Sequence, residues 1–411
     1  MAVKPGYKQT EVGIIPEEWE VVAVERLVEE RTLAKPLDGN HGNIHPKSSD
    51  YVYHGIPFVM ANNFSNGHVN FENCKFITKE RADKLQKGFS VSGDVLLTHK
   101  GTVGNTAIVG ELSTDYIMLT PQVTYYRVLD ANSLNNNFLR HYFDSQSFQS
   151  LFTSLAGGGT RAYLGIVKQL ALPIIMPPIK EQRAIAAVLS DVDALLGALE
   201  RLISKKRNLK QAAMQQLLTG QSRLPGFHGE WEVKRLGEMA EIVMGQSPSS
   251  SNYNSQGDGL PLIQGNADIA NRKTIKRVFT TQITKRGRAG DTLMSVRAPV
   301  GEVSRATFDL CIGRGVCAIR YPNDFLYHYL IFLEPMWGKH SKGSTFESVN
   351  STDVKVVEVQ LPSDFPEQTA IAAVLSDMDD ELAALKQRLD KTRALKQGMM
   401  QELLTGRTRL L

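Results

Sequence analysis

One segment of this 411-residue chain occurs twice, and that duplication limits the possible folds more than any other feature of the sequence. Residues 181–224 align without gaps to residues 367–410 at an offset of 186, and 27 of the 44 aligned positions are identical. Shorter matches precede each copy in the same order, for example Glu18-Trp19-Glu20-Val21 and Glu230-Trp231-Glu232-Val233. The chain therefore consists of two copies of one unit, in which a variable part is followed by a well-preserved segment.

The preserved segment has the composition of a long helix. Alanine, leucine, lysine, glutamine and arginine dominate it, and these are strong helix formers. Prolines precede both copies, where proline can start a helix, and Gly220 and Gly406 stand where a C-terminal cap is expected. From Glu181 to Thr219 such a helix would contain about 39 residues and span about 58 Å.

Apolar residues recur along both copies with the alternating three- and four-residue spacing of a coiled-coil seam. Each copy alone could be a core helix of a bundle. Two matched helices, each following a globular part, favour one antiparallel coiled coil that joins the two parts. The predicted seam consists of Leu189, Val192, Leu196, Leu199 and Ile203 in the first copy, and of Leu375, Met378, Leu382, Leu385 and Leu389 in the second.

The seam then loses its apolar character at Lys206 and Lys210 in the first copy, and at Thr392 and Lys396 in the second. Two interpretations remain open. These positions belong to a solvated stretch of the helix pair, or they mark a change to a surface that binds a partner.

The variable parts have the pattern of strands. Residues 91–109 and 289–303 contain short β-branched runs that are interrupted by glycine and proline. Residues 266–277 are polar and are expected to form a loop. The predicted fold class is α+β, with twisted sheets and long loops in each variable part. Trp19 and Trp231 directly precede apolar alternation, so we interpret them as core anchors.

Motifs of catalysis and cofactor binding are missing from the sequence. It contains neither a phosphate-binding G-x-x-x-x-G-K-[ST] loop nor the N-P-P-[YF] tetrapeptide of amino-methyltransferases. The three cysteines, Cys74, Cys311 and Cys317, form no C-x-x-C pair, so neither a disulfide framework nor a metal site is expected. The absence of an apolar leader and of a membrane-spanning run makes the reducing cytosol the expected location. The chain is expected to bind rather than to catalyse, without a cofactor of its own.

Basic residues are concentrated in the second variable part. Residues 265–320 contain eleven basic and four acidic side chains, although the whole chain has a net charge of only +4. Such a concentration is typical of a surface that binds nucleic-acid phosphates, although a basic run is more often only solvated surface. The candidates there are Arg272, Lys273, Lys276, Arg277, Lys285, Arg286, Arg288, Arg297 and Arg314.

The first variable part shows no net charge bias, so its contacts would have to come from a few individual side chains. Asparagine can pair with adenine and arginine with guanine through two hydrogen bonds, which favours these residue types. The candidates are Asn62, Asn63, His99, Lys100 and Arg161.

At this point the sequence resembles a known family, the specificity (S) subunits of type I restriction-modification systems. The resemblance rests on Tyr7-Lys8-Gln9-Thr10-Glu11-Val12-Gly13-Ile14-Ile15-Pro16 at the start, on Arg223-Leu224-Pro225-Gly226-Phe227 in the middle, and on the P-x-x-E-Q-x-A-I-A pattern at 178–186. The Leu-Leu-Thr-Gly ends at 217–220 and 403–406 also match. The pattern is shorter at the second copy, where Pro366 directly precedes Glu367 and Pro362 lies upstream.

The resemblance implies two target recognition domains, at residues 1–176 and 223–361, and two conserved helices, at 177–222 and 362–411. Each recognition domain would read one half of a split site in double-stranded DNA. The helices would separate the domains and dock two methyltransferase subunits, which bind S-adenosylmethionine, and motor-nuclease subunits would join them. Because the two variable parts differ in sequence and charge, we expect an asymmetric target. Residues 215–224 contain one copy of the short segment that some relatives repeat, which predicts one fixed gap.

Two other hypotheses remain. The chain could be a stand-alone DNA-binding regulator that uses the same fold without methyltransferase partners. It could also be a catalytic nuclease or a fused methyltransferase, but the missing cofactor and paired-carboxylate motifs argue against this.

Overall fold

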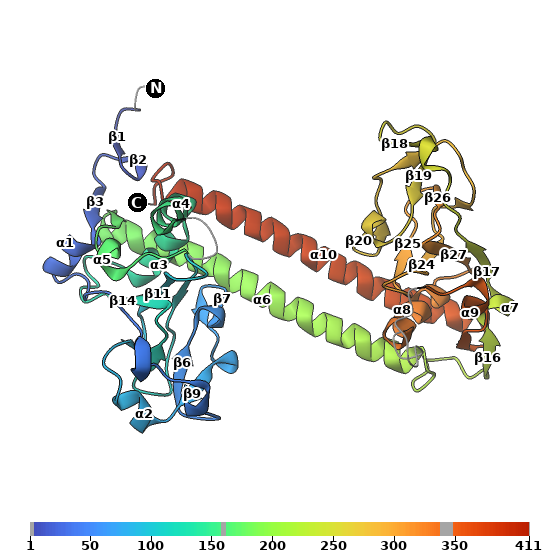
Figure 1. The fold of residues 1–411 in the computed structure, drawn as a ribbon, viewed down its shortest axis with the longest axis horizontal. Helices are drawn as coiled ribbons and strands as arrows, with labels where there is room; N and C mark the ends of the chain where they lie inside the picture. Colours follow the sequence, from blue (N-terminus) through green and yellow to red (C-terminus); the bar gives the residue numbers. More distant parts are fainter. Residues whose placement is uncertain (1–3, 158–161, 338–347, 411) are drawn as a thin grey trace. The chain divides into compact units, whose positions relative to one another are not determined.

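The computed structural model describes residues 4–157, 162–337 and 348–410, which form two compact units (Figure 1). Unit 1 contains residues 1–201 and 387–411, and unit 2 contains residues 202–386. The two preserved segments form the long helices α6 (Ile179–Leu217) and α10 (Phe365–Leu403), each of 39 residues. The predicted helices are thus confirmed, and each begins two residues earlier than the preserved segment. Gly220 and Gly406 lie just beyond the helices with φ of +70° and +68°, the left-handed conformation that favours glycine at a C-terminal cap.

Unit 1 contains two mixed sheets and two two-stranded antiparallel pairs. The six-stranded sheet has the order β4 (Leu37–Asp38), β14 (Val123–Tyr126), β11 (Val95–Thr98), β12 (Thr106–Ile108), β8 (His68–Val69), β7 (Phe64–Ser65). The five-stranded sheet has the order β10 (Phe89–Ser90), β13 (Ile117–Leu119), β6 (Ile56–Val59), β9 (Lys75–Ile77), β5 (Tyr51–Val52). The pairs are β1 (Tyr7–Thr10) with β2 (Gly13–Pro16), and β3 (Glu20–Ala23) with β15 (Pro173–Met176).

Unit 2 repeats the two mixed sheets and the β3–β15 pair strand for strand. Its six-stranded sheet has the order β17 (Glu241–Met244), β27 (Val316–Arg320), β24 (Thr292–Ser295), β25 (Val303–Arg305), β21 (Lys273–Thr274), β20 (Ile269–Ala270). Its five-stranded sheet has the order β18 (Tyr253–Asn254), β22 (Phe279–Thr280), β19 (Leu260–Ile263), β26 (Leu310–Ile312), β23 (Arg286–Gly287), and β16 (Trp231–Arg235) pairs with β28 (Glu358–Pro362). Parallel pairing occurs at equivalent places, between β12 and β8 and between β25 and β21. The duplication seen in the sequence is therefore also a duplication of topology.

Shorter helices complete each unit. Unit 1 has α1 (Val24–Glu29), α2 (Lys79–Asp83), α3 (Asn136–Asp144), α4 (Gln146–Ala156) and α5 (Ile166–Gln169). Unit 2 has α7 (Leu236–Met239), α8 (Phe325–Trp337) and α9 (Ser351–Lys355). In both units the first helix after the six-stranded sheet, α3 or α8, carries a buried Phe-Leu pair and a buried histidine.

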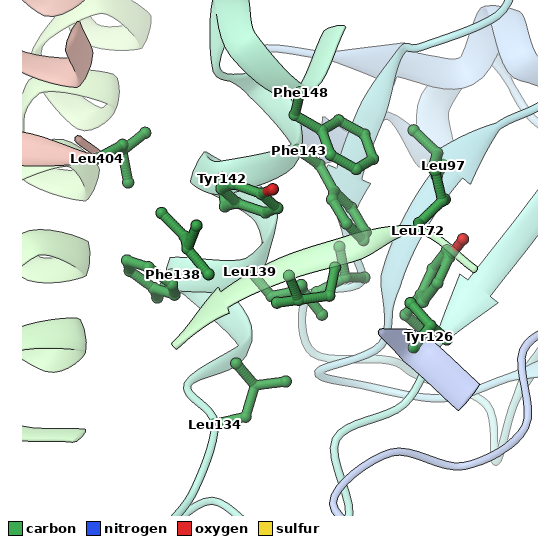
Figure 2. Close-up of a cluster of buried hydrophobic side chains, with 14 of the residues drawn as sticks. Leu97, Tyr126, Leu134, Phe138, Leu139, Tyr142, Phe143, Phe148, Leu172 and Leu404 are labelled. Carbon is green, nitrogen blue, oxygen red and sulfur yellow. The ribbon is translucent and has the colours of Figure 1, made fainter. Parts of the chain in front are cut away.

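Each unit builds its core from its sheets, its short helices and parts of both long helices. In unit 1, Phe138 and Tyr142 of α3 lie between the sheet residues and Leu404, which follows α10 (Figure 2). The same cluster contains Leu189 of α6 and Met400 of α10. The beginning of α6 therefore packs with the end of α10 in unit 1.

In unit 2 the pairing of helix parts is reversed. Met214 and Leu217 from the end of α6 share a core cluster with Ile371 and Leu375 from the beginning of α10. In both units the two long helices thus pair antiparallel, as the sequence predicted. Among the predicted seam residues, Val192, Met378 and Leu385 are half-buried, and the others are buried: Leu189, Leu196, Leu199, Ile203, Leu375, Leu382 and Leu389.

Residues 266–277 depart from the expected loop. They form a short 3-10 turn at Asn266–Asp268 and the hairpin β20–β21. The hairpin turn consists of Asn271 and Arg272, with φ of +50° and +60°. Both central residues of a type I′ turn need positive φ, and arginine is a rare residue there, which is why the sequence pattern did not reveal the hairpin. The equivalent hairpin β7–β8 turns through the common pair Asn66-Gly67.

The three lysines among the polar positions of the seam fit neither of the two interpretations that the sequence left open, whereas the Thr392 hydroxyl donates to the Arg388 carbonyl oxygen of its own helix. In unit 2, Lys206 forms an ion pair with Glu381 at 2.7 Å and Lys210 with Asp379 at 2.5 Å. In unit 1, Lys396 forms one with Asp193 at 2.6 Å. These lysines of one long helix thus bind carboxylates of the other, and are neither fully solvated nor reserved for a partner.

Candidate nucleic-acid interface

Two of the candidate residues in unit 1 are exposed and two are buried. Asn62 lies exposed in the turn before β7, and Lys100 lies exposed two residues after the end of β11. Arg161 falls outside the described residues. Asn63 is buried, and its Oδ1 accepts a 2.8 Å hydrogen bond from the Met60 amide. Its amide group thus stabilises the turn that presents Asn62.

His99 is also buried, beneath the position of Lys100. Its Nδ1 lies 3.0 Å from the carbonyl oxygen of Leu164, and its Nε2 lies 3.8 Å from Oδ2 of Asp38. Burial lowers the pKa of His99, so the ring is held neutral at neutral pH. We therefore remove Asn63 and His99 from the candidate surface and keep Asn62 and Lys100.

Some basic candidates of unit 2 are engaged within the protein. Both Nη atoms of Arg272 donate to the Glu334 carboxylate, at 2.5 and 2.7 Å. Arg277 donates to the carbonyl oxygen of Ala267 at 2.8 Å, and Arg286 pairs with Asp309 at 2.8 Å. A guanidinium that is already paired with a carboxylate gains less binding free energy from a phosphate. Arg272, which donates twice to Glu334, is therefore the weakest of these candidates for a phosphate contact.

The other basic candidates are exposed, and within the described part of the chain their charged groups form no ion pair: Lys273, Lys276, Lys285, Arg288, Arg297 and Arg314. Three of them flank two adjacent strands. Lys285 directly precedes β23 and Arg288 directly follows it, while Arg314 follows the neighbouring strand β26. The carbonyl oxygen of Lys285 accepts a 2.8 Å hydrogen bond from the Ile312 amide, which fixes the register of this edge. Lys285, Arg288 and Arg314 therefore form one basic edge, which we call the β23 edge.

Lys273 lies on a different sheet. In the six-stranded sheet, β21 runs parallel to β25, and the backbone of Lys273 is in register with that of Arg305. The concentration of charge along residues 265–320 thus divides between two sheets, and the structure does not join all of the candidates into one patch.

A buried carboxylate begins each long helix, and the sequence repeat preserved it. In unit 1, Glu181 accepts from Arg409 Nε at 2.6 Å and from Trp19 Nε1 at 3.0 Å. In unit 2 the equivalent Glu367 accepts from Arg223 Nε at 2.5 Å. The glutamate of the repeated Glu-Gln motif therefore ties each helix start to the segment that follows the other long helix.

A second repeated polar group lies beside each seam, and sequence reasoning did not identify it. Junction 1 consists of His141, Ser190, Asp193 and Lys396, and junction 2 of His328, Ser376, Asp379 and Lys210. Nε2 of the histidine lies 3.2 Å from Ser190 Oγ in junction 1 and 2.9 Å from Ser376 Oγ in junction 2. The signal was present, because the histidines and the serines recur in both copies of the sequence.

Both junction histidines are neutral. Burial, assisted by the nearby arginine and lysine charges, lowers the pKa of His141 to about 2. Burial and then the charge of Lys210 lower the pKa of His328 to about 4. Arg140 Nη2 lies 2.8 Å from His141 Nδ1 and 3.0 Å from His141 Nε2, and since a guanidinium only donates, at least one of these ring nitrogens must carry a lone pair.

Comparison with known proteins decides the family. Residues 16–208 and 228–392 match the family described as Type I restriction modification DNA specificity domain. The chain belongs to this family. It is a specificity subunit of a type I restriction-modification system, and it recognises DNA sequence. The two matched segments cover both units, so the resemblance found in the sequence is confirmed.

Similar proteins extend over nearly the whole length of this specificity subunit. A protein of Methanocaldococcus jannaschii, named "Putative type I restriction enzyme MjaX specificity subunit", is 28% identical over 98% of this chain and 97% of its own length. A solved chain described under "Structural basis underlying complex assembly and conformational transition of the type I R-M system" is 25% identical, with a TM-score of 0.57, 95% of this chain and 99% of that chain covered. The S subunit of M. genitalium shares the fold, with a TM-score of 0.63 at 16% identity over 94% of this chain and 96% of that one.

Among the described residues, no helix is long and apolar enough to cross a membrane, and no three metal-binding side chains are grouped as a metal site would require.

Proposed function

We propose that this subunit is non-catalytic and reads a bipartite, asymmetric DNA site with a fixed gap, each unit reading one half. The observation that carries this proposal is the repeated order of strands in units that present different side chains. Equivalent sheets would approach DNA in the same way, whereas different side chains would select different bases. The β23 edge has no equivalent concentration of charge in the sequence of unit 1, which supports an asymmetric target.

The partners that we propose are double-stranded DNA, two methyltransferase subunits and motor-nuclease subunits. S-adenosylmethionine would bind to the methyltransferase and not to this chain. Support comes from apolar side chains that are exposed at equivalent positions of both long helices. Leu209 and Leu395 are 47% and 59% exposed and are related by the 186-residue repeat. Exposed apolar residues kept in both copies fit a partner that docks twice.

The proposed function is tested by producing the protein with its adjacent methyltransferase gene in a methylation-free host. Modified adenines are then mapped across the genome. A bipartite, asymmetric motif with one gap length is expected. A contiguous or palindromic motif would refute the two-reader proposal, and the absence of methylation by a stable complex would favour a stand-alone regulator.

The β23 edge is expected to contribute phosphate contacts. Replacing Lys285 and Arg288 together by glutamate should weaken DNA binding and reduce the slope of log K against log salt by up to about 1.8, because each lost phosphate contact removes about 0.9. Fluorescence anisotropy over a salt series measures this slope. The control Lys355→Glu changes an exposed charge on α9 of the same unit and should leave the slope unchanged. An unchanged slope in the double variant would remove this edge from the interface.

The exposed leucines are expected to control how many methyltransferase subunits bind. Leu395→Glu alters unit 1 and Leu209→Glu alters unit 2, so each single variant should lose one of two methyltransferases, with affinity at that site reduced at least about tenfold. Native mass spectrometry of the purified complex counts the subunits. Leu155→Glu, at an exposed position of α4, is the control and should retain both. Full occupancy in both helix variants would refute this docking surface.

A further inference from the structure

Each junction connects three elements within its own unit. In junction 2, His328 belongs to α8, Ser376 and Asp379 to α10, and Lys210 to α6. Junction 1 repeats this with α3, α6 and α10. The helix beneath the sheets, the long helix that follows it and the opposite long helix therefore meet at one polar point in each unit.

The apolar seam alone does not define how far one long helix is shifted along the other. Its leucines recur every seven residues, for example Leu375, Leu382 and Leu389 on α10. A shift by one heptad would again place leucine against the opposite seam, so apolar packing discriminates poorly between such registers. A polar pair at one seam position is the device that specifies register in coiled coils.

The ion pair of junction 2 distinguishes these registers. Lys210 is mostly buried, with 12% of its side chain exposed, and pairs with Asp379 at 2.5 Å. Shifting α10 by seven residues in either direction would place Ala372 or Lys386 opposite this ammonium group. A buried charge that loses its partner is strongly unfavourable, so only the observed register satisfies Lys210.

The same junction also fixes the domain to the helix. Ser376 lies three residues before Asp379 on α10, and its hydroxyl meets His328 Nε2 at 2.9 Å. The carboxylate of Asp379 lies 3.9 Å from His328 Nδ1. The residues that pair the two long helices are thus in direct contact with the helix that supports the sheets.

We propose that the two junctions are positioning elements that lock the register of the long helices, and that this lock restricts the subunit to one gap length between its half-sites. The inference rests on the proposed function, because a gap exists only if both units read DNA. The junction residues act through the helices and contact neither DNA nor a reacting group.

Junction 2 offers the cleaner test, because Asp193 in junction 1 also binds Arg140. The double variant Lys210→Met with Asp379→Leu removes both charges together, and apolar replacement of a whole ion pair is usually tolerated. Methylation by the complex is measured on DNA duplexes whose gap is one base pair shorter than, equal to, or one base pair longer than the wild-type gap. We expect the preference for the wild-type gap to fall at least about tenfold.

Two further variants separate positioning from general damage. The charge swap Lys210→Asp with Asp379→Lys should recover most of the gap preference, because it restores a pair in the same register. Lys205→Met with Asp377→Leu changes two exposed residues of the same helices and should leave the preference unchanged.

A second readout follows the register without DNA. Spin labels on cysteines introduced at the exposed positions Arg207 and Ala383, both in unit 2, report the distance between the long helices. The wild-type background should give one distance. The Lys210→Met, Asp379→Leu variant should give a broadened or second distribution, because one heptad corresponds to an axial shift of about 10 Å.

Unchanged distances with an unchanged gap preference would overturn the proposal. Broadened distances with an unchanged gap preference would overturn the link between register and gap. A wild-type complex without any gap preference would refute the proposed function and that link together, while the spin-label distances would still decide whether the junction locks the register.

Discussion

Arg223→Met should destabilise unit 2, because it removes the guanidinium that compensates the buried carboxylate of Glu367. Glu367 is fully buried, and Arg223 is the donor that its carboxylate has among the described hydrogen bonds. Trp231 lies close by, but its Nε1 has no hydrogen-bond partner among the described residues. Urea unfolding combined with hydrogen-exchange mass spectrometry of unit 2 peptides measures the loss.

The equivalent substitution in unit 1 provides a matched comparison. Arg409→Met leaves Glu181 with its hydrogen bond from Trp19 Nε1, so the loss in unit 1 should be smaller by about 1.5–3 kcal/mol, the contribution of a hydrogen bond to a charged group. Adding Glu367→Leu to Arg223→Met should recover much of the stability, because no buried charge then remains unpaired. Equal losses at Arg223 and Arg409 would contradict this account, as would an Arg223→Met, Glu367→Leu variant no more stable than Arg223→Met.

The sequence was sufficient to predict the duplication, the two long helices and the family. Each of these depends on local spacing or on a repeat within the chain, as with the seam through Leu189 and Leu196 and the caps at Gly220 and Gly406. The strands around residues 91–109 were predicted for the same reason, because β-branched runs between glycines define strands locally.

The identity of the site residues could not be predicted in the same way. Asn63 and Asn62 are neighbours of one type, yet the turn after Met60 buries one and exposes the other. Arg272 was chosen for its charge, but its partner Glu334 lies 62 residues later in the chain. Side-chain partners that distant depend on the tertiary fold and leave no local pattern.

The partners of the seam lysines were also not predicted from the sequence. Lys210 and Lys396 interrupt the apolar repeat. From the sequence alone, we interpret these positions either as solvated or as part of a surface that binds a partner. Their partners, Asp379 and Asp193, occupy equivalent positions of the opposite copy. The repeat preserved both members of each pair, so a search for charges of opposite sign that recur at the same offset would have found them.

Stability of unit 2 should fall as the solution becomes more acidic than pH 6.5. Burial lowers the pKa of His328 to about 4, whereas an unfolded histidine titrates near about 6.5, so between these values the unfolded state binds the additional proton. The stabilisation is therefore complete above pH 6.5 and is lost as the pH falls toward 4. The loss is about 1.4 kcal/mol per pH unit, or about 2 kcal/mol at pH 5. Lys210 opposes protonation of the ring, while Asp379 and Asp324 favour it, and burial outweighs them.

Urea unfolding at pH 7.5, 6.5, 5.5 and 5.0 measures this loss, in a Trp19→Phe background so that the tryptophans of unit 2, Trp231 and Trp337, report the transition. His328→Gln should flatten the dependence of the unfolding free energy on pH, even if it lowers stability at every pH, because glutamine takes up no proton. His228→Gln changes an exposed histidine of the same unit and should leave the slope as it is in the parent protein. A slope that survives in His328→Gln would mean that another group binds the proton. In the parent protein, the His328 ring would then be protonated beside Lys210 at acidic pH. Its burial disfavours that charged form.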